Sequence, residues 1–404
     1  MKVLIIAQYY PPDMGGGATR ASNIAKGLSL VGVDVTVVTA FPHYPTGIIP
    51  KKYKSKILAV EKEGKINVVR TYVPGLPSKG IGNRLLLFLS FALSSLFAMP
   101  VVKQTDVIWA ANPNIIAVFP SLIYKLKSKC PIFQNVDDLW PDTLYDLGVN
   151  KNSLVAHVGE FLAKVSYKFS AGVTPLSPAY VNILTQKYSV DRNKITIIPA
   201  GVDIDKFYLQ KQKNQKNKNC FKVLYIGSFS PAYDFNQVLM AAKSLSDSSN
   251  VKFIIQGGGE LAFELHQRVK AYGLSNVEVI EKIVPRNEVA EIMADADALI
   301  LPLNGIGSIE LGISSKLYEY QAAGKPILCC SSGQPGRYVM QTNSGIVIKP
   351  GDFEVLSKSI IYLRDNPLIA ESFGSDGRSY VKDNLSIQRI GLAMKKTLNK
   401  TLVN

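Results

Sequence analysis

The sequence predicts an α/β protein with two doubly wound parallel sheets, and three observations lead to this fold class. The chain has 404 residues, more than one ordinary hydrophobic core covers. Two successive series of short apolar, strand-like runs alternate with helix-like runs, as in parallel sheets covered by helices on both faces. The polar, basic stretch from Lys211 to Lys222 lacks apolar periodicity and separates the two series, which is typical of a linker or surface loop.

The first series opens with a strand, a glycine loop and a helix. Val3 to Ala7 form the predicted strand, and an apolar stripe at helical spacing runs from Ala18 to Leu30. Gly15, Gly16 and Gly17 lie between them, where glycine backbone and a helix N-terminus together favour an anionic ligand. A tight turn without a ligand explains the triplet equally well, and the spacing is not the GxGxxG of dinucleotide-binding loops.

Further strands are expected in order along both series. Ligands of doubly wound sheets bind at the carboxyl ends of the strands, so a cleft between two facing domains is the expected site. The predicted strands of the first series continue with residues 35–39, 66–72, 107–110, 132–134, 172–175 and 195–199. Those of the second series are residues 223–229, 253–259, 277–280, 298–303, 326–330 and 345–348.

The composition favours an anionic partner. Lys and Arg number 46 against 31 Asp and Glu, so the net charge is +15, which suits nucleic acid, a membrane surface or a phosphorylated substrate. No RNA-binding signature or zinc-finger spacing supports nucleic acid. The four cysteines form no CxxC motif, which fits a reducing cytosol, and the N-terminal run turns polar too soon for a signal peptide.

The stretch from Leu85 to Val102 is apolar except for its serines and has three interpretations. Its length is near that of a membrane span, but a span there would split the first sheet. A buried core helix is the second interpretation, and a helix in the membrane interface, with Lys79, Arg84 and Lys103 nearby, is the third. For the interfacial helix, Ser in place of Leu86, Phe88 and Phe91 is expected to release the protein from liposomes.

The strongest local site pattern lies between Ser308 and Cys330. Ser314 or Ser315 caps a predicted helix, and Lys316, Glu319 and Tyr320 follow on one helical face. Such a helix N-terminus suits a diphosphate, and the carboxylate one turn later suits a ribose diol. A helix-stabilising Glu beside a solvated Lys is the alternative interpretation.

Two glycine-containing strand ends in the second series are weaker candidates. Gly227 and Ser228 end one predicted strand, and Gly257 and Gly258 end the next one. Both loops suit contact with a phosphate, a nucleotide base or a sugar, and tight turns explain them almost as well.

Acidic residues and one histidine are the remaining candidates. Asp137, Asp138 and Asp142 flank Trp140 after a buried strand, where they suit a hydroxylated ligand or cap the next helix. His43 follows the second strand and is the histidine best placed near a cleft. No DxD pattern with histidine partners indicates a metal site, and no Ser–His–Asp or Cys–His arrangement supports covalent hydrolysis.

Five motifs together resemble the retaining, nucleotide-sugar-dependent glycosyltransferases of family 4, in the right order over nearly the whole chain. They are PPDMGGGATRASNIAKGLSLVGVDVTVVT, IIPAGVDIDKF, VLYIGSF, ADALILPL and SSKLYEYQAAGKPIL. DLWP and FPHYPTG look like the subgroup that builds bacterial surface polysaccharides on lipid carriers. The resemblance implies the GT-B fold: two facing Rossmann-like domains, an acceptor-side domain at 1–200 and a nucleotide-sugar domain at 201–378, with a helix at 379–404 crossing back to the first.

The resemblance also assigns roles to the motif residues. It implies that Gly15, Gly16 and Gly17 face the donor diphosphate and the acceptor, and that Glu319 binds the ribose. The other implied donor contacts are Gly227, Ser228, Gly257, Gly258, Ser315 and Lys316. The sequence departs from the family pattern in two places. The loop SFSPAYDF lacks the basic pair that many members of the family have, so that Lys316 would supply the positive charge. Leu311 stands where a Glu is common, and Glu310 lies one residue earlier.

The expected reaction is transfer of a hexosyl or N-acetylhexosaminyl group, with retention, from a UDP-linked donor to an acceptor hydroxyl on a lipid-linked saccharide. Lys316 would stabilise the leaving diphosphate without metal or cofactor, and Asp138 or His43 would orient the acceptor. The implied location is the inner face of the cell membrane, as a peripheral cytoplasmic protein. A sugar-nucleotide 2-epimerase of the same fold and a non-catalytic sugar-nucleotide or membrane-binding protein are the alternatives.

Overall fold

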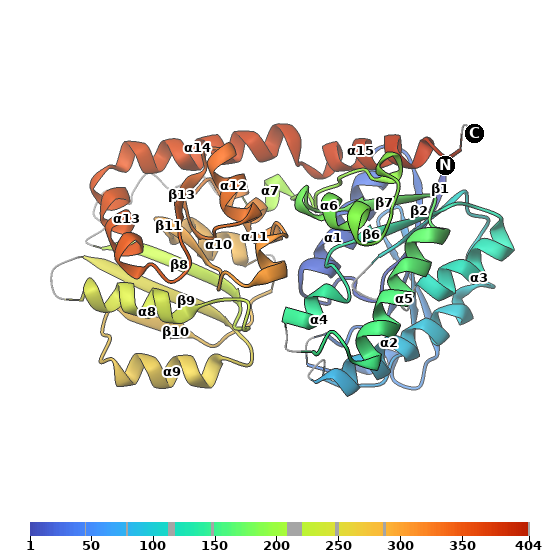
Figure 1. Cartoon of the computed structure of the whole chain (residues 1–404), viewed down its shortest axis with the longest axis horizontal. Helices are drawn as coiled ribbons and strands as arrows, with labels where there is room; N and C mark the ends of the chain where they lie inside the picture. The colour runs from blue at the N-terminus through green and yellow to red at the C-terminus, as the bar shows by residue number, and fades with distance from the viewer. Residues whose placement is uncertain are drawn as a thin grey trace. The chain divides into compact units, whose positions relative to one another are not determined.

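The computed structural model divides into two compact units, each with its own sheet (Figure 1). The first unit is Met1–Gly201 with Ile387–Asn404, and the second is Val202–Ser386. The residues that the structure describes are 1–44, 46–77, 80–111, 118–146, 149–207, 220–246, 250–285 and 288–402. Lys79 and most of the predicted linker, Lys211 to Asn219, therefore lie outside the described residues.

The first unit has a seven-stranded sheet in the order β3-β4-β2-β1-β5-β6-β7. The predicted strands are confirmed except the last: Ile195 makes only an isolated bridge to Val173. One strand, β3, was missed; it pairs antiparallel with β4 at the sheet edge, so this sheet is mixed rather than purely parallel. The strands are β1 (Lys2–Ile6), β2 (Asp34–Ala40), β3 (Leu58–Glu63), β4 (Ile66–Thr71), β5 (Val107–Ala110), β6 (Ile132–Val136) and β7 (Gly172–Pro175).

Helices cover both faces of this sheet. The strand order reverses direction at β1, and right-handed crossovers then place α1 on the face opposite to α2, α3 and α5. The helices are α1 (Gly16–Leu30), α2 (Ile81–Ser94), α3 (Val118–Ser128), α4 (Asp142–Asp146), α5 (Leu154–Phe169), α6 (Ala179–Gln186) and α15 (Ile387–Asn399). The 3₁₀ turns are η1 (Lys51–Tyr53), η2 (Ser95–Ala98) and η4 (Arg192–Lys194).

The C-terminal helix α15 packs on α1 through two glycines (Figure 1). A Cβ on Gly27 would lie 2.5 Å from the carbonyl oxygen of Ile387 and 2.9 Å from the amide nitrogen of Gly391. A Cβ on Gly391 would overlap the Gly27 carbonyl group. Because neither residue has a side chain, the two backbones approach directly, and the end of the chain is part of the first unit.

The apolar stretch from Leu85 to Val102 folds as α2 and η2, with two different faces. Leu87 and Phe91 are fully buried in the core over the sheet, as the core-helix interpretation requires, while Leu86 on the other face is half exposed. The expectation that Phe88 and Phe91 dock on a membrane was wrong, because their side chains are 8% and 0% exposed. Among the described residues, no helix has both the length and the apolar character to cross a membrane.

The second unit has a six-stranded sheet that is fully parallel, as predicted, and its strand order is β10-β9-β8-β11-β12-β13. Its first strand begins earlier than expected, at Phe221, inside the predicted linker. The strands are β8 (Phe221–Ser228), β9 (Val251–Gly258), β10 (Val277–Ile280), β11 (Ala298–Pro302), β12 (Ile327–Cys330) and β13 (Gly345–Ile348).

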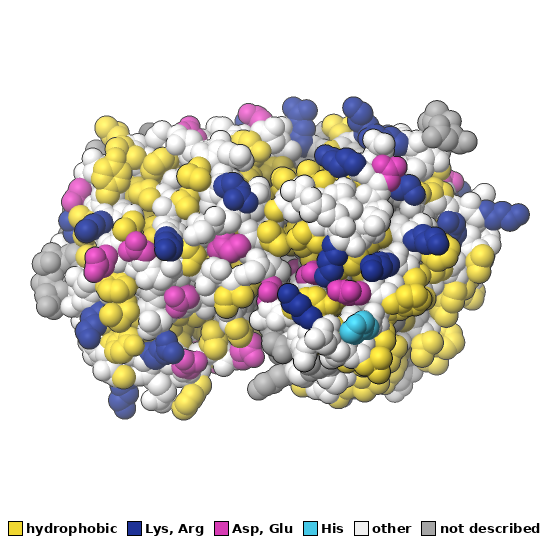
Figure 2. Space-filling model, viewed as in Figure 1, with side chains coloured by type: hydrophobic (Ala, Val, Ile, Leu, Met, Phe, Trp, Pro, Cys, Tyr) yellow, Lys and Arg dark blue, Asp and Glu magenta, His cyan; other side chains and the backbone are white. Residues whose placement is uncertain are grey.

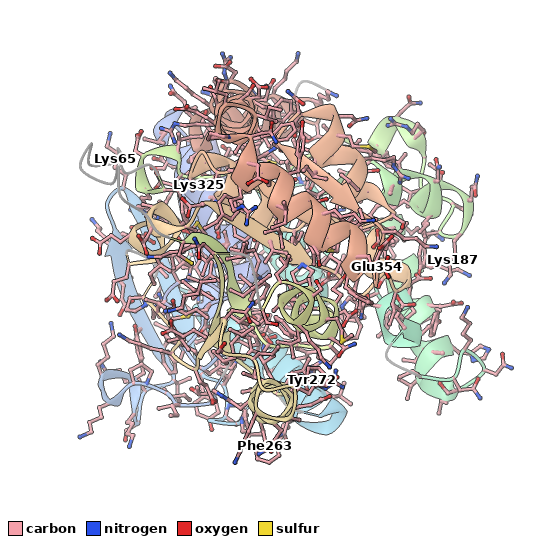
Figure 3. All side chains as sticks on the ribbon, turned by 90° about the vertical axis from the view of Figure 1, so that its left-hand side faces the viewer. Lys65, Lys187, Phe263, Tyr272, Lys325 and Glu354 are labelled. Carbon is pink, nitrogen blue, oxygen red and sulfur yellow. The ribbon has the colours of Figure 1, made fainter. Side chains whose placement is uncertain are left out.

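The helices of the second unit complete its layers. They are α7 (Ile204–Phe207), α8 (Phe235–Ser244), α9 (Ala262–Ala271), α10 (Val289–Asp295), α11 (Ser315–Ala322), α12 (Gln334–Gln341), α13 (Phe353–Asp365) and α14 (Pro367–Asn384), with the 3₁₀ turn η5 (Gly307–Glu310). The inner faces of α8, α9, α13 and α14 bury a core against β8, β9 and β11, whereas Phe263 on α9 points outward into solvent (Figure 3).

Candidate active site

Two of the predicted glycine loops lie side by side in the second unit. The parallel register of β8 and β9 pairs Gly227 with Gly257 and Ser228 with Gly258. Both strands therefore end, and both loops begin, at the same edge of the sheet. A Cβ on Gly257 would overlap the Gly227 carbonyl oxygen, and the amide of Phe229 donates to the carbonyl of Gly258 over 2.9 Å. Close packing of the two strand ends thus explains why residue 257 is a glycine, without a ligand. The carboxyl ends of the strands are nevertheless the place where ligands of doubly wound sheets bind.

The Lys316 side chain lies across Gly227. A Cβ on Gly227 would overlap Lys316 Cε and lie 2.9 Å from its Nζ, so a side chain at position 227 would displace the lysine from this place. Lys316 Nζ donates to the hydroxyl of Tyr233 over 3.0 Å. Tyr233 belongs to the loop that lacks a basic residue, and Lys316 therefore brings a cation to that loop from another element.

Lys316 stands at the N-terminus of α11, whose first turn is capped. Ser314 is the N-cap, and its Oγ accepts the amide N–H of Lys316 over 3.4 Å. Ser315 begins the helix, and the half-buried Glu319 follows Lys316 by one turn. A helix N-terminus carries partial positive charge, so α11 and Lys316 together form an electropositive site beside β8.

The carboxylate of Glu310 accepts hydrogen bonds at the N-terminus of a second helix, α12. Its Oε2 accepts the amide N–H of Gly333, the N-cap of α12, and the Oγ–H of Ser331, each over 2.5 Å. A Cβ on Gly333 would overlap the Glu310 backbone carbonyl oxygen, so this contact also requires a glycine. The displaced glutamate is thus held at the carboxyl end of β12, within the same unit as Lys316.

In the first unit, the glycine loop forms the N-terminus of α1. Gly15 is the N-cap and has no side chain to cap the helix, and Gly16 and Gly17 form its first turn. A Cβ on Gly16 would meet no atom within 4 Å, so protein packing does not require glycine there. The first amide groups of α1 are therefore approachable, and a helix of 15 residues makes them attractive to an anion.

A buried ion pair holds α1 against the sheet. Arg20 Nη1 lies 2.7 Å from Asp137 Oδ1, and the arginine is only 1% exposed. Arg20 Nη2 also donates to the backbone carbonyls of Thr174 over 3.1 Å and Ile198 over 2.6 Å. Because Asp137 directly follows β6 and Thr174 lies near the end of β7, these contacts set the position of the glycine loop relative to the strand ends.

Asp13 and His43 form a second buried polar cluster near that loop. Asp13 Oδ1 accepts the amide N–H groups of His43 over 2.8 Å and Tyr44 over 2.9 Å. Burial, only partly offset by these hydrogen bonds, raises the pKa of Asp13 to about 7. Burial lowers the pKa of His43, so its ring is neutral near pH 7.

The proton of the neutral His43 ring is placed by its neighbour. Nδ1 lies 2.8 Å from the carbonyl oxygen of Phe41, which only accepts, so Nδ1 carries the proton and Nε2 is an acceptor. Among the described residues His43 Nε2 and Asp13 Oδ2 are buried without a hydrogen-bond partner. The ring of Tyr9 stacks on His43 with a centroid distance of 5.5 Å.

The acidic residues after β6 have different roles. Asp137 is used in the ion pair, whereas Asp142 accepts from Lys187 Nζ over 2.7 Å and from the Tyr188 hydroxyl over 2.6 Å. Asp138 has an exposed surface, but the protein around its carboxyl group displaces part of the hydration shell and Asp137 adds a neighbouring charge, and both effects raise its pKa to about 6. Of these three carboxyl groups, Asp138 is the exposed one.

Two family models match consecutive parts of the chain. The model described as "Glycosyltransferase Family 4" matches residues 14–206, and "Glycosyl transferases group 1" matches residues 207–380. The chain is a glycosyltransferase. Over its whole length this glycosyltransferase resembles the solved structure of sucrose-phosphate synthase from Thermosynechococcus elongatus: the TM-score is 0.78 at 16% identity, covering 100% of this chain and 99% of that one. The fold is GT-B, as the resemblance implied.

Curated relatives of the glycosyltransferase come from archaea and bacteria. An uncharacterised glycosyltransferase of Methanocaldococcus jannaschii is 22% identical and covers 100% of this chain and 99% of its own length. An O-antigen chain mannosyltransferase of Salmonella typhimurium is 26% identical over 57% of this chain and 61% of its own. The UDP-Gal:alpha-D-GlcNAc-diphosphoundecaprenol alpha-1,3-galactosyltransferase of Escherichia coli is 22% identical over 46% of this chain and 49% of its own length.

The structure brings some predicted site residues of the glycosyltransferase together and adds others. Gly227, Ser228, Gly257, Gly258 and Lys316 meet at one sheet edge. In the first unit, His43 is buried and Asp138 is exposed.

Sequence reasoning missed three features of the site. Tyr233, which holds Lys316, stands in a loop that was examined only for basic residues. Asp13 and Arg20 were also missed; a lone arginine within the apolar stripe of α1 was the available signal for a buried ion pair.

Proposed function

We propose that this glycosyltransferase transfers a sugar, with retention of configuration, from a UDP-linked donor to an acceptor hydroxyl. The observation that carries the proposal is the position of Lys316 over Gly227, with its Nζ bound to the Tyr233 hydroxyl at 3.0 Å. A cation fixed at the N-terminus of a helix and the carboxyl end of a strand suits a diphosphate. Glu319, one turn further along α11, then accepts hydrogen bonds from the ribose hydroxyls.

The chemical role of Lys316 follows from where charge develops. As the sugar–oxygen bond breaks, negative charge grows on the departing diphosphate, and a fixed cation stabilises that charge more than it stabilises the ground state. The amide groups of Ser315 and Gly258, in the same unit as Lys316, act in the same sense. Because this positive charge comes from the chain itself, we propose that transfer needs no divalent ion.

The first unit is proposed to hold the acceptor. Asp138 is an exposed carboxyl of that unit, and a pKa of about 6 leaves it ionised at neutral pH, able to accept a hydrogen bond from the attacking hydroxyl. His43 is buried, so we place it as a positioning residue that acts through Tyr9 and the Asp13 loop.

The acceptor is proposed to be a lipid-linked saccharide in surface polysaccharide synthesis at the inner face of the cell membrane. The names of two relatives support this, since one extends an O-antigen chain and the other uses a diphosphoundecaprenol-linked sugar. The net charge of +15 also suits an acceptor that carries phosphate at an anionic surface.

A screen of nucleotide sugars tests the proposal. The full chain is heated with UDP-glucose, UDP-galactose, UDP-N-acetylglucosamine or GDP-mannose, and a bound donor raises the melting temperature by mass action. If a UDP-sugar stabilises the protein, as we expect, it is then incubated with membrane lipid extract, and release of UDP is measured; stabilisation by GDP-mannose alone would contradict a UDP-linked donor. UDP release that depends on the extract supports transfer, whereas conversion of the donor without any acceptor would identify an epimerase. Binding of a donor without either reaction would identify a non-catalytic binding protein.

A further inference from the structure

The outer surfaces of three helices in the first unit form one apolar face. Figure 2 shows hydrophobic side chains gathered over the region of α2, α3 and α5. We define the apolar face by six side chains that are 41–79% exposed: Leu86, Leu89 and Leu93 of α2, Ile123 and Leu126 of α3, and Phe161 of α5.

These helices are tied together by contacts beneath the face. The hydroxyl of Tyr124 in α3 donates to the carbonyl of Ser95, directly after α2, over 2.9 Å. On the other side, Phe88 of α2 packs edge-on against Trp140, with ring centroids 6.1 Å apart. A Cβ on Gly159 of α5 would lie 3.0 Å from the Pro141 side chain, so α5 packs on the same segment.

The pattern on this face is the reverse of an ordinary surface helix. Leu86, Leu89 and Leu93 recur at three- and four-residue intervals on the solvent side, where a surface helix normally carries polar residues. In the second unit, large exposed apolar residues such as Phe263 and Leu368 stand on separate helices, which is usual for a soluble surface. A contiguous apolar patch across three helices indicates a binding surface.

The charges on the same helices and their loops are almost all positive. Arg84, Lys103, Lys129, Lys164 and Lys168 are exposed there. From Ile81 to Pro131, the only acidic residue in the sequence is Asp106. Two copies of the chain meeting through this face would set these cations against one another, whereas an anionic lipid surface accepts both the apolar side chains and the positive charges.

We propose that the apolar face docks on a bilayer that contains anionic phospholipid, with the leucines among the acyl chains and the cations at the headgroups. The inference rests on the proposed lipid-linked acceptor, because docking brings the first unit to the surface where such an acceptor lies. The docking surface is not the single stretch Leu85 to Val102 of the interfacial-helix interpretation but a surface that α2, α3 and α5 build together.

Co-sedimentation of the full chain with vesicles tests the docking. We expect binding to vesicles that contain phosphatidylglycerol and much weaker binding to pure phosphatidylcholine. Leu89→Ser and Leu126→Ser are each expected to lower the partition coefficient about tenfold, because inserting one leucine contributes roughly that factor. Lys164→Gln and Lys168→Gln are each expected to lower it about fivefold at low salt.

Phe263→Ser and Leu368→Ser are the controls, because they remove apolar side chains of the second unit that are as exposed as Leu126 and more exposed than Leu89, and they are expected to leave vesicle binding unchanged. Circular dichroism and melting temperature confirm that each variant is folded. Wild-type binding by the Leu89 and Leu126 variants, or equal binding to both kinds of vesicle, would overturn the proposal. So would a dimer in solution that Leu126→Ser converts to a monomer, since the face would then join two copies.

A water-soluble acceptor separates docking from catalysis. With a short-chain analogue of the acceptor lipid, Leu89→Ser is expected to transfer sugar at the wild-type rate, because chemistry no longer requires the vesicle. A wild-type protein that binds anionic vesicles but transfers no sugar to any acceptor would contradict the proposed function and leave the docking surface supported. Slow transfer by Leu89→Ser to the soluble analogue would count against a role in docking alone.

Discussion

Lys316 lies across Gly227, although 89 residues separate them in the sequence; a side chain at position 227 would occupy the space of the lysine. The hydrogen bond from Lys316 Nζ to the Tyr233 hydroxyl fixes the end of the side chain. Three elements thus converge on one cation: the end of β8, the loop that follows it and the first turn of α11. Its position is therefore set by the fold, and the proposed chemistry depends on it.

Replacing Gly227 with alanine is expected to displace Lys316 and slow transfer. The added methyl group would overlap Lys316 Cε, and the positive φ of 151° at Gly227 also disfavours a side chain. Loss of one preorganised stabilising group typically costs about 100-fold or more in kcat, so we expect a decrease of about 100-fold in kcat/KM.

The double variant Gly227→Ala/Lys316→Met separates displacement of the lysine from general damage. If alanine acts by moving Lys316, the double variant should transfer no more slowly than Lys316→Met alone. Fully additive losses in kcat/KM would show that the two positions act independently and would contradict the contact described above.

Breaking the Arg20–Asp137 ion pair is expected to destabilise the first unit. Arg20→Met leaves the carboxylate of Asp137 buried without its charged partner, and such changes cost about 3–5 kcal/mol. Urea denaturation of Arg20→Met measures the loss. Arg20→Met/Asp137→Leu should recover part of it, because the double variant has neither buried charge. Unfolding of Arg20→Met at the wild-type urea concentration would show that the pair contributes nothing.

The protonation of Asp13 is expected to make stability depend on pH. Its folded pKa is about 7 against an ordinary value of 3.8, so the folded protein binds a proton that the unfolded chain releases over this range. Stability from this group is therefore present near pH 4 and is lost as the pH rises to about 7.

Asp13→Asn provides the comparison, because its amide oxygen can still accept from the backbone of His43 and Tyr44. The free energy of unfolding of the wild type, relative to Asp13→Asn, should fall between pH 4 and about 7 and then level off. The opposite effect of His43, whose folded pKa is lowered, is present in both proteins and largely cancels. A difference that stays constant with pH would contradict the raised pKa of Asp13.

Gly391→Ala is expected to weaken the packing of α15 on α1. The added methyl group would overlap the Gly27 carbonyl, and overpacking of this kind typically costs about 1–3 kcal/mol. Gly82→Ala is the control, because a Cβ at that position meets no atom within 4 Å. Melting temperatures of the two variants check the prediction; an equal effect in both would mean that the helix crossing tolerates a side chain.

The fold was predictable from the sequence because its signals are local. Apolar runs such as the one from Val3 to Ala7, which a glycine loop and a helical stripe follow, mark parallel strands one at a time. The edge strand β3 was missed because its sequence LAVEKE carries three charges on six residues and none of its side chains is fully buried. An edge strand of this kind is identified by its pairing with a neighbouring strand, here β4. A local sequence pattern does not show such pairing.

The candidate site was predictable only in part, because its contacts join distant residues. Lys316 and Gly227 were each found in their own motif, but the contact between them, and the part of Tyr233 in it, required the folded unit. The same holds for Arg20 and Asp137, which pair across 117 residues. Apolar composition alone also did not show which side of α2 is buried, so Phe88 and Phe91 were expected on the wrong face.

The most direct test of the central claim is the affinity of the protein for UDP compared with uridine. Isothermal titration is performed with the wild type and with Lys316→Met, since only UDP carries the diphosphate that Lys316 is proposed to hold. We predict that Lys316→Met binds UDP much more weakly and binds uridine as the wild type does. Unchanged UDP affinity in Lys316→Met would contradict the account, and so would an equal loss for both ligands.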